Sequence, residues 1–242
     1  MLLIAGPCQI ESESHAIEMA QALLESTKGL PLNLVYKSSF DKANRTSLSG
    51  QRGPGLDLGL QALAAVKQRY SLPLLTDIHT PEQAKAAAEV VDVLQTPAFL
   101  CRQTDLLIAV GQTGKAINCK KGQFLHPSDM RYAAEKISSS GNNKIMLCER
   151  GTCFGYRDLI CDPRALVMLR DLGYPVIFDA THSVQVMGGQ SGASGAQRQF
   201  VKPLIRSACA IGIDGLFIEC HEDPDRAPSD GASMLPIKEL RS

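Results

Sequence analysis

The sequence alternates short apolar runs with longer amphipathic stretches. Eight runs have the length and composition of buried strands, and they lie 19 to 40 residues apart from start to start. These runs are residues 2–6, 33–37, 73–77, 92–96, 116–120, 144–148, 175–179 and 215–219. Nearly continuous apolar strands of this kind are typical of a parallel sheet that helices cover.

The stretches between these runs carry the signals of helices. In one of them, apolar residues recur three and four positions apart, at Leu56, Leu60, Leu63 and Val66. Thr80, Pro81 and Gln83 predict the start of another helix, with an N-cap threonine, a proline in the first turn and a capping-box glutamine. The segment DPRAL at 162–166 predicts a further start of the same kind. Strand and helix therefore alternate along the chain.

Eight strand-then-helix units predict an α/β protein of the (β/α)8 TIM-barrel type, in a single domain over residues 1–242. A doubly wound open sheet is the alternative. Its first turn normally carries a glycine fingerprint, whereas residues 6–12 read GPCQIES. Only 23 residues follow the last predicted strand, so we expect the eighth helix to be short or absent. The glycine-rich patch at 188–195 is either a surface loop or a lid over the catalytic face.

Composition narrows the class of protein. The 25 basic and 25 acidic residues give a formal net charge of zero, which does not favour a nucleic-acid-binding surface. The eight scattered cysteines include no C-x-x-C pair and are typical of buried thiols in a reducing compartment. The first residues lack the pattern of a signal peptide, and no apolar run has the length of a membrane span. We therefore expect a cytoplasmic protein without nucleic-acid or membrane partners.

Cationic residues gather where the predicted strands end. They are Lys37, Lys42, Arg45, Lys120 and Arg150. In a barrel the loops after the strands build the active site, and buried cations in one place repel one another unless an anion joins them. Phosphate suits such a site because arginine binds it bidentately and lysine acts as a compact charge. Pairing of each cation with a nearby carboxylate on a solvated rim is the alternative.

A second group of polar residues has the chemistry of metal ligands. Cys8, His182 and Glu219 lie at the ends of strands one, seven and eight, which are neighbours in a closed eight-stranded barrel. Asp230 lies in the segment after strand eight. Sulfur, nitrogen and oxygen donors together favour Zn²⁺ or Fe²⁺, and also allow Mn²⁺ or Co²⁺, over Mg²⁺ or Ca²⁺. Taken singly, such a cysteine is usually a packing residue and such a histidine a hydrogen-bonding one.

Several motifs taken together are those of a known enzyme family. They are KSSFDKANRTS at 37–47, RGPGL at 52–56, TDIHTPEQA at 76–84, QTPAFLCRQTDLL at 95–107, KKGQF at 120–124, ERGTCFGY at 149–156, FDATHSVQ at 178–185 and FIECHEDPDRAPSDG at 217–231. From about residue 4 to residue 236 the chain resembles the 3-deoxy-D-manno-octulosonate 8-phosphate synthases. The KANRTS element is the most specific, because the sister family of 3-deoxy-D-arabino-heptulosonate 7-phosphate synthases carries K-P-R-T there.

The resemblance implies a homotetrameric (β/α)8 transferase. Its reaction would condense phosphoenolpyruvate with arabinose 5-phosphate and release inorganic phosphate, in lipopolysaccharide (Kdo) biosynthesis. The resemblance implies that phosphoenolpyruvate is held by Lys42, Lys120 and Arg150, with Lys37 and Gln95 nearby. It implies that arabinose 5-phosphate contacts Asn44, Arg45 and Thr46, the last of which is usually serine in the family. It also implies that Arg102 reaches the sugar phosphate of a neighbouring subunit.

The family divides into two branches at the position of Cys8. One branch has asparagine there and works without metal, and the other has cysteine and needs a divalent ion. The resemblance therefore implies the metal-dependent branch, with the ligands Cys8, His182, Glu219 and Asp230. The catalytic residues would be Lys42, Lys120, Asp77 and His182. Asp77 and His182 are the candidates for proton handling, although a liganded His182 cannot also be a free base.

Three other functions stay open at the level of the sequence. A heptulosonate synthase would take erythrose 4-phosphate instead of arabinose 5-phosphate. A metal-dependent aldolase, which is a lyase, would use no phosphoenolpyruvate and release no phosphate. A barrel that only binds or regulates would have no reason to keep Lys42, Lys120, Arg150 and the four ligand positions.

Overall fold

The computed structural model describes residues 1–190 and 193–241. Eight parallel strands form a closed barrel, because β1 pairs with both β2 and β12. In order around the barrel the strands are β1 (Leu2–Gly6), β2 (Asn33–Lys37), β3 (Leu74–Asp77), β4 (Val93–Thr96), β5 (Ala116–Lys120), β6 (Ile145–Glu149), β9 (Val176–Asp179) and β12 (Gly215–His221). The predicted (β/α)8 barrel is confirmed, and the open doubly wound sheet is excluded.

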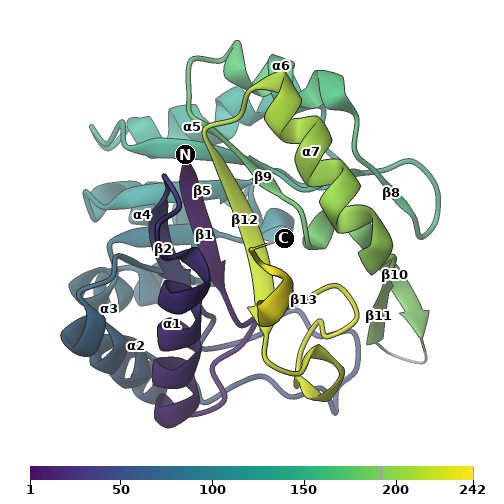
Figure 1. The fold of residues 1–242 in the computed structure, drawn as a ribbon. Coiled ribbons are helices and arrows are strands. Elements are labelled where there is room, and N and C mark those ends of the chain that lie inside the picture. Colours follow the sequence, from purple (N-terminus) through teal and green to yellow (C-terminus); the bar gives the residue numbers. More distant parts are fainter. Residues whose placement is uncertain (191–192, 242) are drawn as a thin grey trace.

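Seven α-helices of the described residues surround the barrel (Figure 1). They are α1 (Glu13–Thr27), α2 (Leu56–Tyr70), α3 (Pro81–Val90), α4 (Thr104–Gln112), α5 (Met130–Ser138), α6 (Pro163–Arg170) and α7 (Val201–Ile211). Figure 1 shows α1, α2 and α3 side by side on one flank, where neighbouring helices contact one another. Because helices connect consecutive strands in this way, all strands run in the same direction and their carboxyl ends share one mouth.

Capping residues explain where several helices begin. Before α1, the Ser12 side chain accepts a hydrogen bond from the backbone N–H of His15 at 3.1 Å. Thr80 and Gln83 form a capping box at the start of α3, and Asp162 caps α6. The helix starts predicted at 80–83 and 162–166 are therefore confirmed.

The interior of the barrel is layered. One layer is an apolar cluster made of Ile4, Val35, Leu75, Val93, Cys148, Ile177 and Phe217, which we call the apolar floor. Nearer the carboxyl ends of the strands the inward side chains become charged. On β12, Phe217 and Glu219 are two positions apart and therefore share the inward face, and both are completely buried. The larger core lies between the outside of the barrel and the helices.

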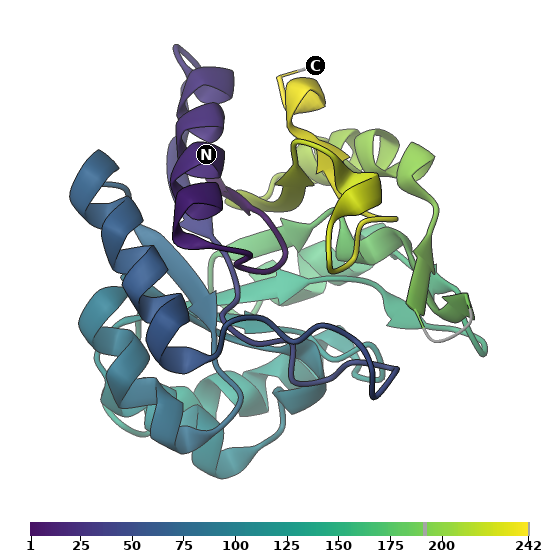
Figure 2. The same cartoon turned by 90° about the horizontal axis from the view of Figure 1, so that it is seen from below.

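No α-helix follows β12 in the described residues, which agrees with the expected short or absent eighth helix. The final segment contains the short helix η5 (Pro224–Arg226), the strand β13 (Leu235–Pro236) and the short helix η6 (Ile237–Glu239). β13 pairs with Cys220 and His221 at the end of β12. η6 contacts α1, and the two lie side by side in Figure 2. This segment therefore covers the flank where an eighth helix would lie.

Smaller elements connect the barrel units. Two antiparallel hairpins pair β7 (Thr152–Cys153) with β8 (Leu159–Ile160), and β10 (Gln185–Gln190) with β11 (Ala193–Ala196). Four further short helices are η1 (Ala98–Leu100), η2 (Pro127–Asp129), η3 (His182–Val184) and η4 (Arg198–Phe200).

The second hairpin contains most of the patch at 188–195, and positions 191–192 of that patch lie outside the described residues. Much of the patch is therefore strand where we expected loop. Among the helices described, none is both long and apolar enough to cross a membrane.

Candidate active site

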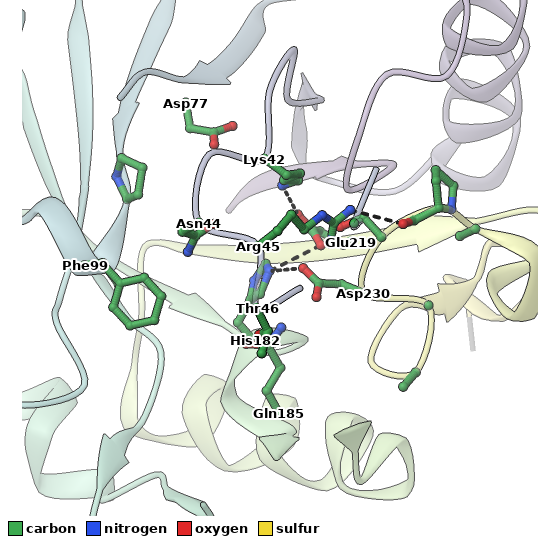
Figure 3. Close-up of a pocket in the computed structure, with 18 of the residues that line it drawn as sticks. Lys42, Asn44, Arg45, Thr46, Asp77, Phe99, His182, Gln185, Glu219 and Asp230 are labelled. Atoms are coloured by element: carbon green, nitrogen blue, oxygen red, sulfur yellow. Dashed lines mark hydrogen bonds and ion pairs between the residues drawn. The ribbon is translucent and has the colours of Figure 1, made fainter. Parts of the chain in front are cut away.

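A cavity of about 600 Å³ opens at the carboxyl ends of the barrel strands (Figure 3). Most residues nominated from the sequence line it, namely Lys37, Lys42, Asn44, Arg45, Thr46, Asp77, Gln95, Lys120, Arg150, His182, Glu219 and Asp230. Cys8 is buried next to the cavity, where its thiol contacts Asp230. Arg102 is exposed and lies outside the lining. Seven different strands and their following loops thus bring polar side chains to one mouth.

The four residues nominated as metal ligands converge. The Cys8 thiol donates to Asp230 Oδ2 at 3.2 Å. His182 Nε2 lies 3.3 Å from Glu219 Oε2 and 3.7 Å from Asp230 Oδ2. One ligand atom each from Cys8, Glu219 and Asp230 also fall within 4.8 Å of one another. These distances are short enough for one ion to contact Cys8, Glu219 and Asp230, and His182 Nε2 lies beside two of these three ligands.

The surroundings of these four side chains fit a divalent cation. Glu219 Oε2 is buried and accepts no hydrogen bond among the described residues, although His182 Nε2 lies 3.3 Å from it, so it can still accept a cation. Burial, together with the neighbouring Glu219, raises the pKa of Cys8 well above its ordinary value. A positive ion at this position would remove that penalty and favour the thiolate. The donor set of sulfur, nitrogen and two carboxylates is suited to Zn²⁺ or Fe²⁺.

The two carboxylates of the group stay ionised in spite of their burial. Burial favours the neutral form of Glu219, but Lys37 and His182 hold its pKa well below the usual range. Burial also acts against the charge of Asp230, but the nearby His182, whose Nε2 lies 3.7 Å from Asp230 Oδ2, lowers the pKa of Asp230 to about 2. Lys37 donates to Glu219 and to the backbone carbonyl of Cys8. This lysine therefore links β2 to β12 across β1.

Lys42 and Asp77 form a second charged group at the cavity wall. Lys42 Nζ donates to Ser39 Oγ at 2.9 Å, and Ser39 in turn donates to Asp77. Asp77 Oδ2 also lies 3.1 Å from His79 Nε2. Burial favours the neutral form of Asp77, but Lys42 and His79 overcome it and hold the pKa far below its ordinary value. Asp77 is therefore an ionised hydrogen-bond acceptor.

Lys120 and His182 share one carboxylate, that of Asp179. Lys120 Nζ donates to Asp179 Oδ2, and His182 Nδ1 lies 2.7 Å from the same oxygen. Burial alone would lower the pKa of His182, but the charge of Asp179 raises it to about 9. With Nδ1 fixed by Asp179, the ring presents Nε2 to Glu219 and Asp230. A carboxylate that orients a histidine in this way is common behind metal-ligating histidines.

Arg150 is a buried cation with an open donor. Its Nη2 donates to Gln185 Oε1 at 2.6 Å, whereas Nη1 is buried without a hydrogen-bond partner among the described residues. Burial disfavours the charged guanidinium and lowers its pKa. An anion in the cavity would satisfy both the open donor and the charge.

The segment after β2 supplies the outer wall of the cavity. Arg45 donates to the carbonyl of Gln51 at 2.7 Å, and at 3.1 Å to both Gln9 Oε1 and the carbonyl of Pro228. Asn44 and Thr46 flank it and also line the cavity (Figure 3). The contacts of Arg45 link this segment to the loop after β12, which carries Asp230.

Gln95 and Asn118 lie on neighbouring strands at the base of the cavity. Asn118 Nδ2 donates to Gln95 Oε1 at 2.9 Å, and both residues are buried. This contact fixes the side-chain oxygen of Gln95, a residue that lines the cavity. Asn118 is therefore a supporting residue for Gln95.

Three polar residues of the site received no role from the sequence. Ser39 connects Lys42 to Asp77, Asp179 connects Lys120 to His182, and Gln185 holds Arg150. Asp179 ends a predicted strand, which was a usable signal because charged strand ends face the mouth of a barrel. Ser39 lies in the loop after β2 and Gln185 is the first residue of β10, and neither position is charged, so the reasoning from charged strand ends did not select them.

Comparisons with known proteins agree with this geometry. The family model described as "DAHP synthetase I family" matches residues 1–242. A protein of Rhizobium meliloti (strain 1021) named 2-dehydro-3-deoxyphosphooctonate aldolase is 58% identical over 240 residues, which cover 99% of this chain and 86% of that protein. A protein of the same name from Brucella ovis (strain ATCC 25840 / 63/290 / NCTC 10512) is 59% identical over 240 residues, covering 99% of this chain and 87% of the relative.

Proposed function

The chain belongs to the DAHP synthetase I family, and from this premise we propose that it is a transferase that condenses phosphoenolpyruvate with D-arabinose 5-phosphate and water. The products are 3-deoxy-D-manno-octulosonate 8-phosphate and inorganic phosphate. The relatives named above bear the name of this product, because 2-dehydro-3-deoxyphosphooctonate is a synonym for it. The chain is therefore an enzyme that forms a carbon–carbon bond.

The observation that carries this proposal is the convergence of Lys42, Lys120 and Arg150 on one cavity. Arg150 Nη1 is buried without a hydrogen-bond partner in the described part of the chain, so the cavity has a donor that an anion could satisfy. Phosphoenolpyruvate carries both a phosphate and a carboxylate and can meet several cations at once. We assign Lys42, Lys120 and Arg150 to these two groups, with Lys37 and Gln95 at the edge of the same subsite.

The second substrate is assigned to the outer wall of the cavity. Asn44, Arg45 and Thr46 offer an amide, a guanidinium and a hydroxyl, which suit the hydroxyls and phosphate of a phosphorylated sugar. Placing the sugar there puts its aldehyde toward the base of the cavity, next to phosphoenolpyruvate. The cations hold two mutually repelling anions together, so catalysis comes mainly from positioning and electrostatics.

The reaction forms one carbon–carbon bond and breaks one carbon–oxygen bond. C3 of phosphoenolpyruvate attacks the aldehyde carbon of arabinose 5-phosphate, and the aldehyde oxygen takes up a proton to become a hydroxyl. Water adds to C2 of phosphoenolpyruvate and loses a proton. The phosphate then leaves C2 with the electrons of the C–O bond, and the new C2 hydroxyl gives its proton to the departing phosphate, so that the C2 ketone of the product remains.

Of the two candidates for proton handling, Asp77 is better placed than His182. Both ring nitrogens of His182 face carboxylates, with Asp179 on one side and Glu219 on the other. Asp77 lines the cavity and is held ionised by Lys42 and His79. We assign Asp77 to accept a hydrogen bond from a substrate hydroxyl or from the reacting water, which orients that group.

Cys8, His182, Glu219 and Asp230 would hold a divalent metal ion, which we take to be Zn²⁺ or Fe²⁺, with Mn²⁺ and Co²⁺ as alternatives. When bound, such an ion supplies a positive charge that polarises or orients an oxygen atom of the substrate or of water. Lys37 keeps Glu219 ionised, and Asp179 orients the ring of His182. These neighbours prepare the ligands for a cation.

The larger biological setting is also proposed. We infer a homotetramer in which Arg102 contributes to the cavity of a neighbouring subunit, because Arg102 is exposed and does not reach the cavity of its own chain. The substrates are small phosphorylated metabolites, which supports a cytoplasmic enzyme of lipopolysaccharide (Kdo) biosynthesis. Mixing Arg102→Ala subunits with Arg150→Met subunits would restore part of the activity if the sites are shared, and none if each chain works alone.

A phosphate-release assay tests the activity. With phosphoenolpyruvate, we expect release with arabinose 5-phosphate and at least about tenfold less with erythrose 4-phosphate, because the sugar phosphate must reach its subsite. Faster release with erythrose 4-phosphate would identify a heptulosonate synthase. A lyase of the aldolase class would form no phosphate from the two substrates. Calorimetric binding of both substrates without turnover would identify a binding protein.

A further inference from the structure

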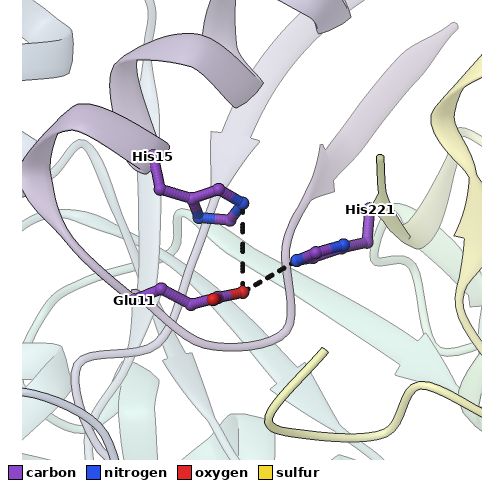
Figure 4. A group of neighbouring side chains, drawn as sticks. All are labelled: Glu11, His15 and His221. Atoms are coloured by element: carbon purple, nitrogen blue, oxygen red, sulfur yellow. Dashed lines mark hydrogen bonds and ion pairs between the residues drawn. The ribbon is translucent and has the colours of Figure 1, made fainter. Parts of the chain in front are cut away.

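A second group of potential metal ligands lies outside the cavity. It consists of Glu11, His15 and His221, and we call it the outer cluster (Figure 4). Glu11 lies between β1 and α1, His15 is in the first turn of α1, and His221 is the last residue of β12. The cluster is thus built where the start of α1 meets the end of β12. None of its three residues lines the cavity.

The ligand atoms of the outer cluster lie at coordination spacing. His221 Nε2 is 2.7 Å from Glu11 Oε1, and His15 Nε2 is 3.9 Å from the same oxygen. All three atoms fall within 4.8 Å of one another. Ligands of a tetrahedral Zn²⁺ ion are separated by about 3.3 Å, since each lies about 2.0–2.1 Å from the metal. Figure 4 shows both rings directed at the carboxylate of Glu11.

We propose that the outer cluster is a second, independent binding site for a divalent transition-metal ion such as Zn²⁺. Two imidazole nitrogens and one carboxylate oxygen form a donor set that zinc accepts readily. Glu11 is exposed, so water can complete the coordination sphere. The set contains no thiol, which separates it chemically from the site at Cys8.

The protonation of the two rings is compatible with this role. His221 Nδ1 lies 3.2 Å from Glu222 Oε2, so Glu222 can accept the proton on Nδ1 while Nε2 binds the ion. In exchange, His221 gives up the hydrogen bond that its Nδ1 accepts from the backbone N–H of Asp223. His15 Nδ1 is buried without a partner in the described part of the chain, so no hydrogen bond prevents the proton of His15 from residing there. Each Nε2 can therefore offer its lone pair to an ion once it releases the proton that it donates to a carboxylate, that of Glu222 for His15 and that of Glu11 for His221.

The charge balance also suits a divalent ion. His15 Nε2 lies 3.1 Å from Glu222 Oε2, so Glu222 belongs to the immediate surroundings of the cluster. Two neutral imidazoles with the carboxylates of Glu11 and Glu222 carry two negative charges, which one M²⁺ ion neutralises. The ion would link the segment that begins at Cys8 to the strand that carries Glu219, because β1 and β12 are paired neighbours. Occupancy of the outer cluster would thus brace two segments that supply ligands to the inner site.

Cobalt titration of the full-length protein distinguishes the two sites. A Co²⁺ ion bound by a thiolate gives a sulfur-to-cobalt absorption band, so this band reports only the site at Cys8. Total bound Co²⁺ is measured in parallel by equilibrium dialysis and elemental analysis. For the unmodified chain we expect total binding to exceed the saturation point of the band by one further equivalent. In the His15→Ala variant this further equivalent is lost, and the band is unchanged.

Control variants separate metal binding from a loss of structure. His126→Ala removes a histidine that caps η2 and should leave both equivalents in place. Glu222→Gln should keep the second equivalent but weaken it by about 10- to 100-fold, as expected for a partner behind a ligand. Circular dichroism checks that each variant is folded. If His15→Ala is not folded, His15→Gln is used in its place.

The proposal is overturned if the unmodified chain binds no Co²⁺ beyond the saturation point of the band, or if folded His15→Ala or His15→Gln retains the second equivalent. If the sulfur-to-cobalt band is missing and the protein still binds one equivalent of Co²⁺ that depends on His15, the inner site is refuted and the outer cluster is supported.

Discussion

The two layers of the barrel interior differ in chemistry although they are consecutive on the same strands. In the apolar floor, side chains such as Phe217 and Ile177 are buried against one another. One layer nearer the mouth, Glu219 and Lys37 are equally buried but charged. The layers meet directly, because Lys120 Nζ lies 4.0 Å from the centre of the Phe217 ring.

The difference between the layers indicates that they have different roles. Burial of apolar surface stabilises a fold by roughly 25 cal/mol per Å², whereas burial of a charge is unfavourable unless a partner compensates it. The apolar floor therefore contributes stability, and under the proposed function the charged layer serves binding and catalysis at a cost in stability. Substitutions in the two layers should consequently change different measurements.

The largest effect is expected in the apolar floor. Phe217→Ala removes a completely buried ring and leaves a cavity under Lys120, so the free energy of unfolding should fall by about 3–5 kcal/mol. Urea denaturation monitored by circular dichroism measures this loss. The matched control is Phe154→Ala, because Phe154 is 87% exposed and its loss should change stability by less than about 0.5 kcal/mol. Equal losses in both variants would contradict the assignment of stability to the floor.

The next largest effect is expected in the charged layer, on activity. Arg150→Met should lower kcat/KM by about 10²–10³-fold, since the cavity loses a preorganised donor. Its free energy of unfolding should change by less than about 1 kcal/mol, because loss of the hydrogen bond to Gln185 is offset by removal of a buried charge. Arg164→Met is the control, since Arg164 pairs with Asp162 at the surface. If Arg150→Met lost much stability but kept normal kinetics, the assignment of function to the charged layer would be wrong.

Metal removal tests the proposed metal ligands of the charged layer. Chelation with EDTA should lower phosphate release by about 100-fold or more, and Zn²⁺, Fe²⁺, Mn²⁺ or Co²⁺ should restore it. Cys8→Ala should be nearly inactive with or without chelator, because it lacks the thiolate ligand. Both are measured with the phosphate assay. Full activity of Cys8→Ala after chelation would show that the metal assignment is wrong.

The smallest effect is expected at a residue that only supports the charged layer. Asn118→Ala leaves Gln95 without its donor, so KM for phosphoenolpyruvate should rise by about tenfold, equivalent to about 1.4 kcal/mol. KM for arabinose 5-phosphate should stay within about twofold, because its subsite lies at the outer wall. In the control Asn142→Ala, hydrogen bonds to Gly111 and Lys115 outside the barrel are lost, which should lower stability without changing either KM. Equal changes in both KM values would argue for a general loosening of the site.

Much of this arrangement was predictable from the sequence because it follows from strand direction. Residues at the carboxyl ends of parallel strands meet at one mouth, so Lys42, Lys120 and Arg150 had to converge once the barrel was recognised. The same reasoning brought Cys8, His182 and Glu219 together, since β1, β9 and β12 are neighbours.

The rest depends on contacts that no local pattern encodes. Ser39 bridges Lys42 and Asp77 only because β2 and β3 pair in one register and the side chains adopt particular rotamers. The outer cluster joins residues more than 200 positions apart, as with Glu11 and His221. The β10–β11 hairpin was missed because glycine and serine predict loops, whereas pairing between the two segments determines their structure here.

The pairing of β13 with the end of β12 has a consequence for the loop that carries Asp230. Cys220 pairs with Leu235, and His221 pairs with Pro236. The intervening residues 222–234 therefore form a loop whose two ends are held together by strand pairing. Closing this loop costs conformational entropy, and the pairing of β13 with β12 offsets that cost without any ligand. An ion bound as we propose would therefore meet Asp230 on a loop that is already ordered, and little of its affinity would be lost to ordering the chain.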